Sequence, residues 1–170
     1  MTPTPVKLVL VVTLLLTVGA LVVLLDHMRR TLDTGEVAPI LWLLTGLFAL
    51  RVAGQVVVVV RAPSWLPPME DWNLVPYRLL LPSQIVILGV MVWIDVSFAT
   101  SSGPPVERAA GFGWFLVGFS LVYAGSMAVR YAVRMRRRPD ARWFGGTIPM
   151  VFHVVLATYL LALGAFHVGA

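Results

Sequence analysis

The chain has 170 residues, of which 59% are hydrophobic and only 12% are charged. Soluble domains carry about 25% charged residues, so this composition excludes a disordered chain, a coiled coil and a water-soluble globule. The chain contains no cysteine, which excludes disulfides, thiolate catalysis, Cys-ligated metal clusters and covalently attached c-type haem. We therefore expect an integral membrane protein with a single transmembrane domain over residues 1–170.

Apolar runs that are long enough to cross a bilayer occur at five places. A helix of about 20 apolar residues spans a hydrocarbon core of about 30 Å. The runs cover residues 6–25, 39–60, 79–100, 109–131 and 147–168. They predict an all-α polytopic fold, a bundle of five transmembrane helices. The first run exceeds the apolar core of a signal peptide, which has about 7–15 residues, so we expect a retained helix there.

Basic residues are distributed unequally between the two sides of such a bundle. If the five spans alternate in direction, nine of the 13 Lys and Arg residues lie on one side, three lie on the other, and Arg51 lies inside the membrane. The side rich in Lys and Arg faces the cytoplasm. The sequence therefore predicts a protein of a bacterial-type cytoplasmic membrane, with its N-terminus inside and its C-terminus outside.

The densest group of basic residues follows the fourth run and is expected to contact anionic lipid headgroups. Its members are Arg134, Arg136, Arg137 and Arg138. The net charge of +5 could also suggest nucleic acid as a partner. We do not expect that partner, because the basic residues lie between apolar runs, where lipid headgroups are nearer.

Small residues recur every seven positions within the fourth run, at Gly111, Gly118 and Gly125. This period keeps them on one helix face, where a neighbouring helix can approach closely. Ala157 and Gly164 have the same spacing in the fifth run. We expect both rows to be helix contact surfaces.

Polar side chains inside the membrane are the strongest functional candidates, since a charge there costs about 2.5–3.5 kcal/mol on insertion scales. Arg51 lies near mid-membrane, and no carboxylate shares its depth. A rise of about 1.5 Å per residue predicts that six polar residues meet in the cytoplasmic half. They are Arg51, Gln55, Gln84, Tyr123, Ser126 and His153. Either this cluster binds an anionic headgroup or substrate, or Arg51 holds the bundle together through its polar neighbours.

A second polar group is expected at the outer ends of the helices, where its side chains are reasonable ligands for Zn, Cu or Fe. Its members are Asp26, His27, Asp95 and His167. A solvated helix end would look the same. His153 and His167 lie about 21 Å apart on one helix, a spacing that resembles the histidines holding two haems in membrane b-type cytochromes. Two such haems need four histidines and the chain has 3, so the count allows one haem b between His27 and His167.

Three functions follow from these observations. The first is non-catalytic: an accessory or assembly subunit of a larger membrane complex, or a lipid-binding helical bundle. For this function we expect the chain to form either a homo-oligomer or part of a larger membrane complex. The second is an electron-transfer module that carries haem b or contacts quinone. The third is a transporter or channel for anions or small solutes, built as an oligomer. An enzyme is weakly supported, because no serine, histidine and acid share one depth. We favour the first function.

Overall fold

The computed structural model describes residues 33–61, 77–137 and 147–169. Within these ranges the chain forms four long helices and one short 3-10 turn. They are α2 (Thr34–Arg61), α4 (Tyr77–Ala99), η1 (Pro104–Val106), α5 (Ala110–Arg137) and α6 (Ile148–Val168).

Helices α2, α4, α5 and α6 each have the length and the apolar composition needed to cross a membrane. An all-helical bundle of the membrane type is therefore confirmed for the described part of the chain. Five spans are not confirmed, because the expected first span, residues 6–25, lies outside the described residues.

Helices α4 and α6 agree with their apolar runs to within two residues at each end, whereas α2 and α5 extend beyond theirs through polar residues. Helix α2 begins at Thr34, before the expected residue 39, where the Asp33 carboxylate accepts a hydrogen bond from the backbone N–H of Glu36 at 2.9 Å. Such a contact caps a helix start. Helix α5 continues past the expected residue 131 to Arg137, so Arg134, Arg136 and Arg137 lie in its last turn and not in a loop. Basic side chains in the last turn stabilise a helix, because their charge interacts favourably with the negative end of the helix dipole.

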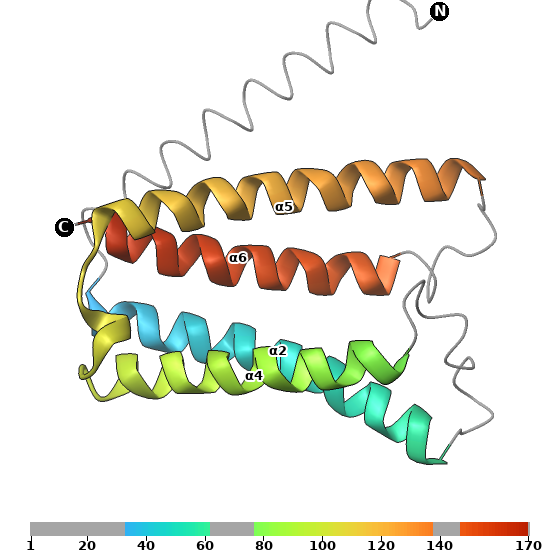
Figure 1. The fold of residues 1–170 in the computed structure, drawn as a ribbon, viewed down its shortest axis with the longest axis horizontal. Coiled ribbons are helices and arrows are strands. Elements are labelled where there is room, and N and C mark those ends of the chain that lie inside the picture. The colour runs from blue at the N-terminus through green and yellow to red at the C-terminus, as the bar shows by residue number, and fades with distance from the viewer. Residues whose placement is uncertain (1–32, 62–76, 138–146, 170) are drawn as a thin grey trace, which may run out of the picture.

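The helices form two packed pairs, α5 with α6 and α2 with α4, which are joined where α2 packs on α6. Figure 1 shows α5 and α6 side by side, with α2 and α4 crossing beneath them. Helix α6 contacts both α5 and α2, and α2 contacts α4. The core fills the space between α2, α4 and α6 with buried large side chains. These include Leu41, Phe48, Met91, Phe98, Tyr159 and Phe166.

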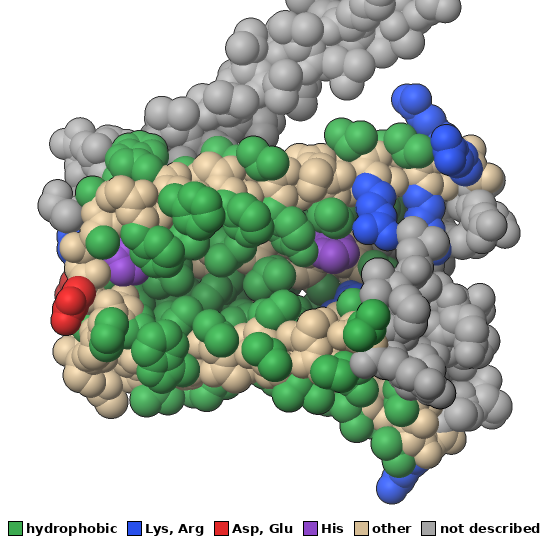
Figure 2. All heavy atoms as spheres, viewed as in Figure 1, with side chains coloured by type: hydrophobic (Ala, Val, Ile, Leu, Met, Phe, Trp, Pro, Cys, Tyr) green, Lys and Arg blue, Asp and Glu red, His purple; other side chains and the backbone are tan. Residues whose placement is uncertain are grey.

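The outer surface of the bundle is also apolar. Leu50, Val60 and Val122 are each exposed by two thirds or more, at 67%, 73% and 72%. Figure 2 shows hydrophobic side chains spread along the length of the helices, with basic side chains gathered at one end. A continuous exposed apolar surface of this kind fits contact with lipid chains and not with water.

Helices α5 and α6 approach most closely at a pair of glycines. A Cβ atom on Gly113 would lie 2.7 Å from the backbone nitrogen of Val168 and 2.9 Å from the carbonyl oxygen of Gly164. The expected contact role of Gly164 and of Ala157, which is 4% exposed, is therefore confirmed. Close backbone contact at small residues is how membrane helices pack.

The expected row on α5 is wrong for this contact. A Cβ atom on Gly111, Gly118 or Gly125 would meet no described atom within 4 Å. The face of α5 that packs on α6 carries Gly113 and Ser120 instead. Spacing shows which small residues share a face, but it does not show where that face points.

We expect Gly113→Ala to lower the stability of the bundle, because its methyl group collides with the backbone of α6. Overpacking of this kind costs about 1–3 kcal/mol. Gly118→Ala is the matched control on the same helix. It should leave stability unchanged or raise it slightly, since alanine favours a helix over glycine by up to about 1 kcal/mol. Thermal unfolding of both variants in detergent checks this, and equal midpoints for the two would contradict the close approach at Gly113.

Candidate functional site

Helix α2 carries a buried cation and a buried amide one turn apart. Arg51 is 8% exposed and Gln55 is 0% exposed. The guanidinium carbon of Arg51 lies 5.0 Å from the centroid of the Phe152 ring on α6, which is cation–π distance. In the described part of the chain, no hydrogen-bond partner reaches Nη1 of Arg51 or either polar atom of the Gln55 side chain. The described helices thus leave these three buried atoms without a hydrogen-bond partner.

Gln84 adds a third unpaired group from α4. It is 8% exposed, and its buried Oε1 atom has no hydrogen-bond partner among the described residues. Buried polar atoms are nearly always hydrogen-bonded, and each one left unpaired costs about 1–3 kcal/mol. Arg51, Gln55 and Gln84 thus each carry a buried polar atom that no described residue pairs.

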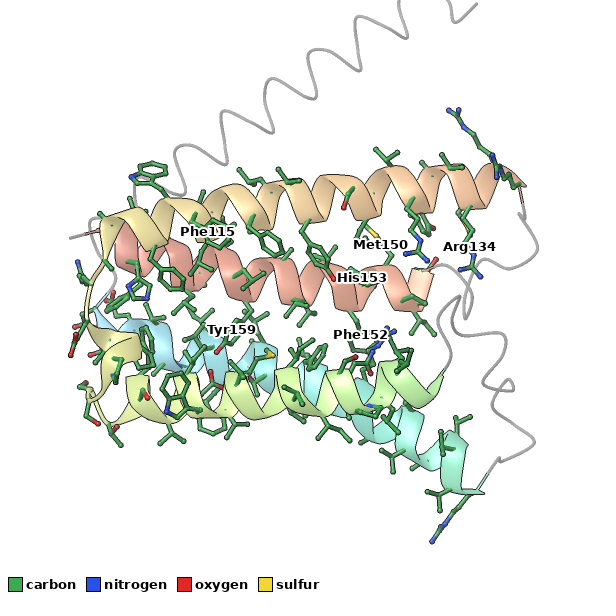
Figure 3. All side chains as sticks on the ribbon, in the orientation of Figure 1. Phe115, Arg134, Met150, Phe152, His153 and Tyr159 are labelled. Carbon is green, nitrogen blue, oxygen red and sulfur yellow. The ribbon has the colours of Figure 1, made fainter. Side chains whose placement is uncertain are left out.

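A tyrosine and a histidine complete the cluster from α5 and α6. The hydroxyl oxygen of Tyr123 lies 2.6 Å from Nδ1 of His153. Arg51 interacts electrostatically with both side chains. Figure 3 shows how α6 serves both sides of the site: His153 points toward α5, while its neighbour Phe152 points toward α2 and α4. We call Arg51, Gln55, Tyr123 and His153 the Arg51 cluster.

The structure thus brings Arg51, Tyr123 and His153 together, as the depth argument predicts, and buries Gln55 and Gln84. Ser126 does not join them. It is exposed, and its hydroxyl donates to the carbonyl oxygen of Tyr123 on its own helix at 2.8 Å. Depth alone does not fix the direction of a side chain around the helix axis. Phe152 is the residue that sequence reasoning missed, because an apolar side chain in an apolar run carries no signal.

A separate polar contact joins α4 and α6 nearer the other end of the bundle. Asp95 is 0% exposed, and its Oδ1 atom lies 2.9 Å from the hydroxyl oxygen of Tyr159. Thr45 of α2 faces both side chains. Sequence reasoning assigned Asp95 to the outer metal group and overlooked Tyr159 and Thr45. Their signal was present, since both are polar residues within apolar runs.

His167 has a different environment from Asp95. It is 2% exposed, and Nδ1 accepts a hydrogen bond from the backbone N–H of Ala109 at 3.4 Å. The Arg108 guanidinium donates to the carbonyl oxygen of Gly169. These two contacts tie the residues just before α5 to the end of α6.

The described residues do not assemble the expected metal group. Over residues 33–61, 77–137 and 147–169, no three His, Cys, Asp or Glu side chains gather as metal ligands do. Asp26 and His27 lie outside the described residues. His153 and His167 lie about 21 Å apart along α6, so one haem iron cannot bind both. The haem b arrangement therefore depends on His27 and stays a prediction.

Comparison of the chain with protein-family models, curated proteins and solved structures gives no match. The class of the protein therefore rests on its own fold and site. It is a helical bundle with membrane-length helices and a cluster of buried and half-buried polar groups, some of them unpaired among the described residues.

Proposed function

We propose that the protein is a non-catalytic, membrane-embedded binding bundle, which holds the anionic head group of an amphipathic molecule at Arg51. One observation carries this proposal: Nη1 of Arg51 is buried and has no partner among the described residues. A guanidinium binds a carboxylate or phosphate through charge-assisted hydrogen bonds. Gln55 offers an unpaired donor and an unpaired acceptor one turn away, which suits an oxygen-rich head group.

Basic side chains favour an anionic ligand over a neutral one. Arg130 and Arg134 follow Tyr123 along one face of α5, at helical spacing. Arg130 is close enough to His153 to interact with it electrostatically, and Figure 3 shows Arg134 pointing from α5 toward the start of α6. His153 lies about 8 Å along the axis from that start. Positive charge therefore extends from the end of the bundle to the Arg51 cluster.

We propose further that residues 6–25 add a fifth span and that the basic end of the bundle faces the cytoplasm. The unequal distribution of Lys and Arg supports this orientation. Anionic lipid headgroups would then surround Arg134, Arg136 and Arg137 in the last turn of α5. The ligand would reach the Arg51 cluster from the cytoplasmic leaflet, within a homo-oligomer or as a subunit of a larger membrane complex.

We expect the wild-type protein to retain an acidic amphipathic molecule through purification in mild detergent, and Arg51→Gln to lose it. Loss of charge-assisted hydrogen bonds worth about 1.5–3 kcal/mol weakens binding by roughly ten- to a hundredfold. Native mass spectrometry and analysis of the extracted molecules measure retention. Arg61→Gln, an exposed change at the end of the same helix, is the matched control and should retain the molecule.

Folded Arg51→Gln protein that carries the same acidic molecule at the wild-type level would contradict the proposal. Liposome flux distinguishes the transport alternative from binding alone. A binding bundle gives no Arg51-dependent anion flux, whereas an anion transporter or channel does.

A further inference from the structure

Asp95 lies in the interior of the bundle, where α2, α4 and α6 meet, and has no cation at its level among the described residues. Thr45 faces it from α2 and Tyr159 faces it from α6. The nearest basic side chains along those helices are Arg51 and His153. Each is six positions away from the facing residue, or about 9 Å along the axis. Within the described helices, Tyr159 is thus the one titratable group that faces the carboxyl group.

The contacts around Tyr159 place its hydroxyl between two acceptors. The hydroxyl oxygen lies 2.9 Å from Oδ1 of Asp95 and 3.2 Å from the carbonyl oxygen of Met91. A phenol has one proton to donate, and an ionised carboxylate only accepts hydrogen bonds. With Asp95 ionised, that single proton would have to be shared between both contacts. A proton on Oδ1 removes the conflict, because Asp95 then donates to Tyr159 and Tyr159 donates to Met91.

Burial favours the same arrangement. Asp95 has no exposed surface, and no hydrogen bond of ordinary geometry reaches its buried Oδ2 atom from the described residues. The neutral Thr45 hydroxyl is the other polar group that faces this carboxyl group. An ionised carboxylate in such surroundings is far more costly than a neutral one, and a group of this kind usually becomes neutral instead. A neutral carboxyl group tolerates one unpaired carbonyl oxygen much better than a carboxylate tolerates an unpaired charge.

We infer that Asp95 is a proton-binding site within the membrane, held as the neutral carboxylic acid at neutral pH, with Tyr159 as its positioning residue. This inference is independent of anion binding at Arg51. Loss of the proton to water leaves a carboxylate, which draws the Tyr159 hydroxyl proton away from Met91. A carbonyl group on α4 then loses its partner from α6, and a charge without a counterion stands between three helices. The proton therefore helps to hold α4 against α6.

The inference is tested by infrared spectra of the lipid-reconstituted wild type and of Asp95→Asn at pH 7, with the variant spectrum subtracted from that of the wild type. The expected result is a C=O stretching band of a protonated carboxylic acid that shifts in D2O and is absent from Asp95→Asn. Glu107→Gln removes an exposed acid and should keep the band. Tyr159→Phe should keep it at a shifted frequency, because the acid loses its hydrogen-bond partner. A wild-type spectrum without this band, or an Asp95→Asn spectrum that retains it, overturns the inference.

Two further measurements guard against a variant that merely fails to fold. Asparagine replaces a neutral acid with a neutral donor of similar shape, so Asp95→Asn should fold and unfold at nearly the wild-type temperature. A variant that does not fold counts against the neutral acid. Addition of Na+ should leave the wild-type unfolding temperature unchanged. A Na+-dependent rise in wild type that Asp95→Asn lacks would show an ionised, cation-binding carboxylate and overturn the inference.

Discussion

Arg51→Met should make the ligand-free protein more stable to heat than the wild type and abolish its stabilisation by acidic amphiphiles. Arg51 is buried, with Nη1 lacking a partner in the described part of the chain. Replacing buried charges by apolar side chains of similar volume is often neutral or stabilising by about 1–4 kcal/mol. Methionine keeps a long, adaptable side chain against Phe152, so the change removes the charge without opening a large cavity.

The sign of this change separates the two roles that the sequence leaves open for Arg51. If Arg51 holds the bundle together through its polar neighbours, breaking that contact should cost about 3–5 kcal/mol. If Arg51 instead binds an anionic ligand, its unpaired guanidinium destabilises the ligand-free protein. Replacing Arg51 by methionine then removes that cost and raises the stability. Thermal unfolding of delipidated protein, with and without an added acidic amphiphile, measures both effects. Arg61→Met serves as the control for loss of one charge from the exposed end of α2.

Tyr159→Ala should lower the stability of the bundle by about 3–5 kcal/mol, more than Gly113→Ala or Tyr159→Phe. Tyr159 is 2% exposed and belongs to the core between α2, α4 and α6. Its ring fills the space between helices, and its hydroxyl contacts both Asp95 and the Met91 carbonyl group. The alanine variant loses the buried ring and the hydroxyl. The Asp95 carboxyl group and the Met91 carbonyl group then lose their partner on α6.

Tyr159→Phe separates the contribution of ring packing from that of the hydroxyl contacts. It keeps the ring and removes the hydroxyl, so the expected loss is smaller, about 1–3 kcal/mol for buried groups left unpaired. Denaturation midpoints of the two variants in the same detergent give the comparison. Thr158→Ala, an exposed change at the adjacent position that touches only its own helix, should unfold like the wild type. Equal losses for the alanine and phenylalanine variants would show that packing of the ring contributes nothing.

The all-helical fold class follows from length and hydropathy, and so does the level of the Arg51 cluster along the helices; the fifth span and the depth of the cluster in a membrane stay predictions. A helix advances by a fixed distance per residue, so counting places Arg51, Tyr123 and His153 at one level, and the structure joins them. Counting does not reveal which way each face points. Ser126 has a suitable depth and is exposed, and the seven-residue glycine row of α5 turns away from α6 for the same reason.

The contacts that sequence reasoning missed depend on partners far apart in the chain. The Phe152 ring against Arg51 and the Tyr159 hydroxyl against Asp95 arise only once α6 packs beside α2 and α4. His167 is a different case. Its chemistry suggests a metal ligand, and its Nδ1 atom accepts one hydrogen bond, from the backbone N–H of Ala109 just before α5. The metal and haem predictions for His167 depend on His27, which lies outside the described residues, so they stay predictions.

Whether Arg51 holds an anionic ligand can be seen in an experimental density map at side-chain resolution, from protein purified in native lipid. We expect non-protein density within hydrogen-bonding distance of Nη1 of Arg51, shaped as an acidic head group with an apolar tail and also in reach of Gln55. The same map of Arg51→Gln should lack this density. A wild-type map in which protein groups alone pair the Arg51 guanidinium, with side chains packed around it and no density beside it, would show that Arg51 binds no such ligand.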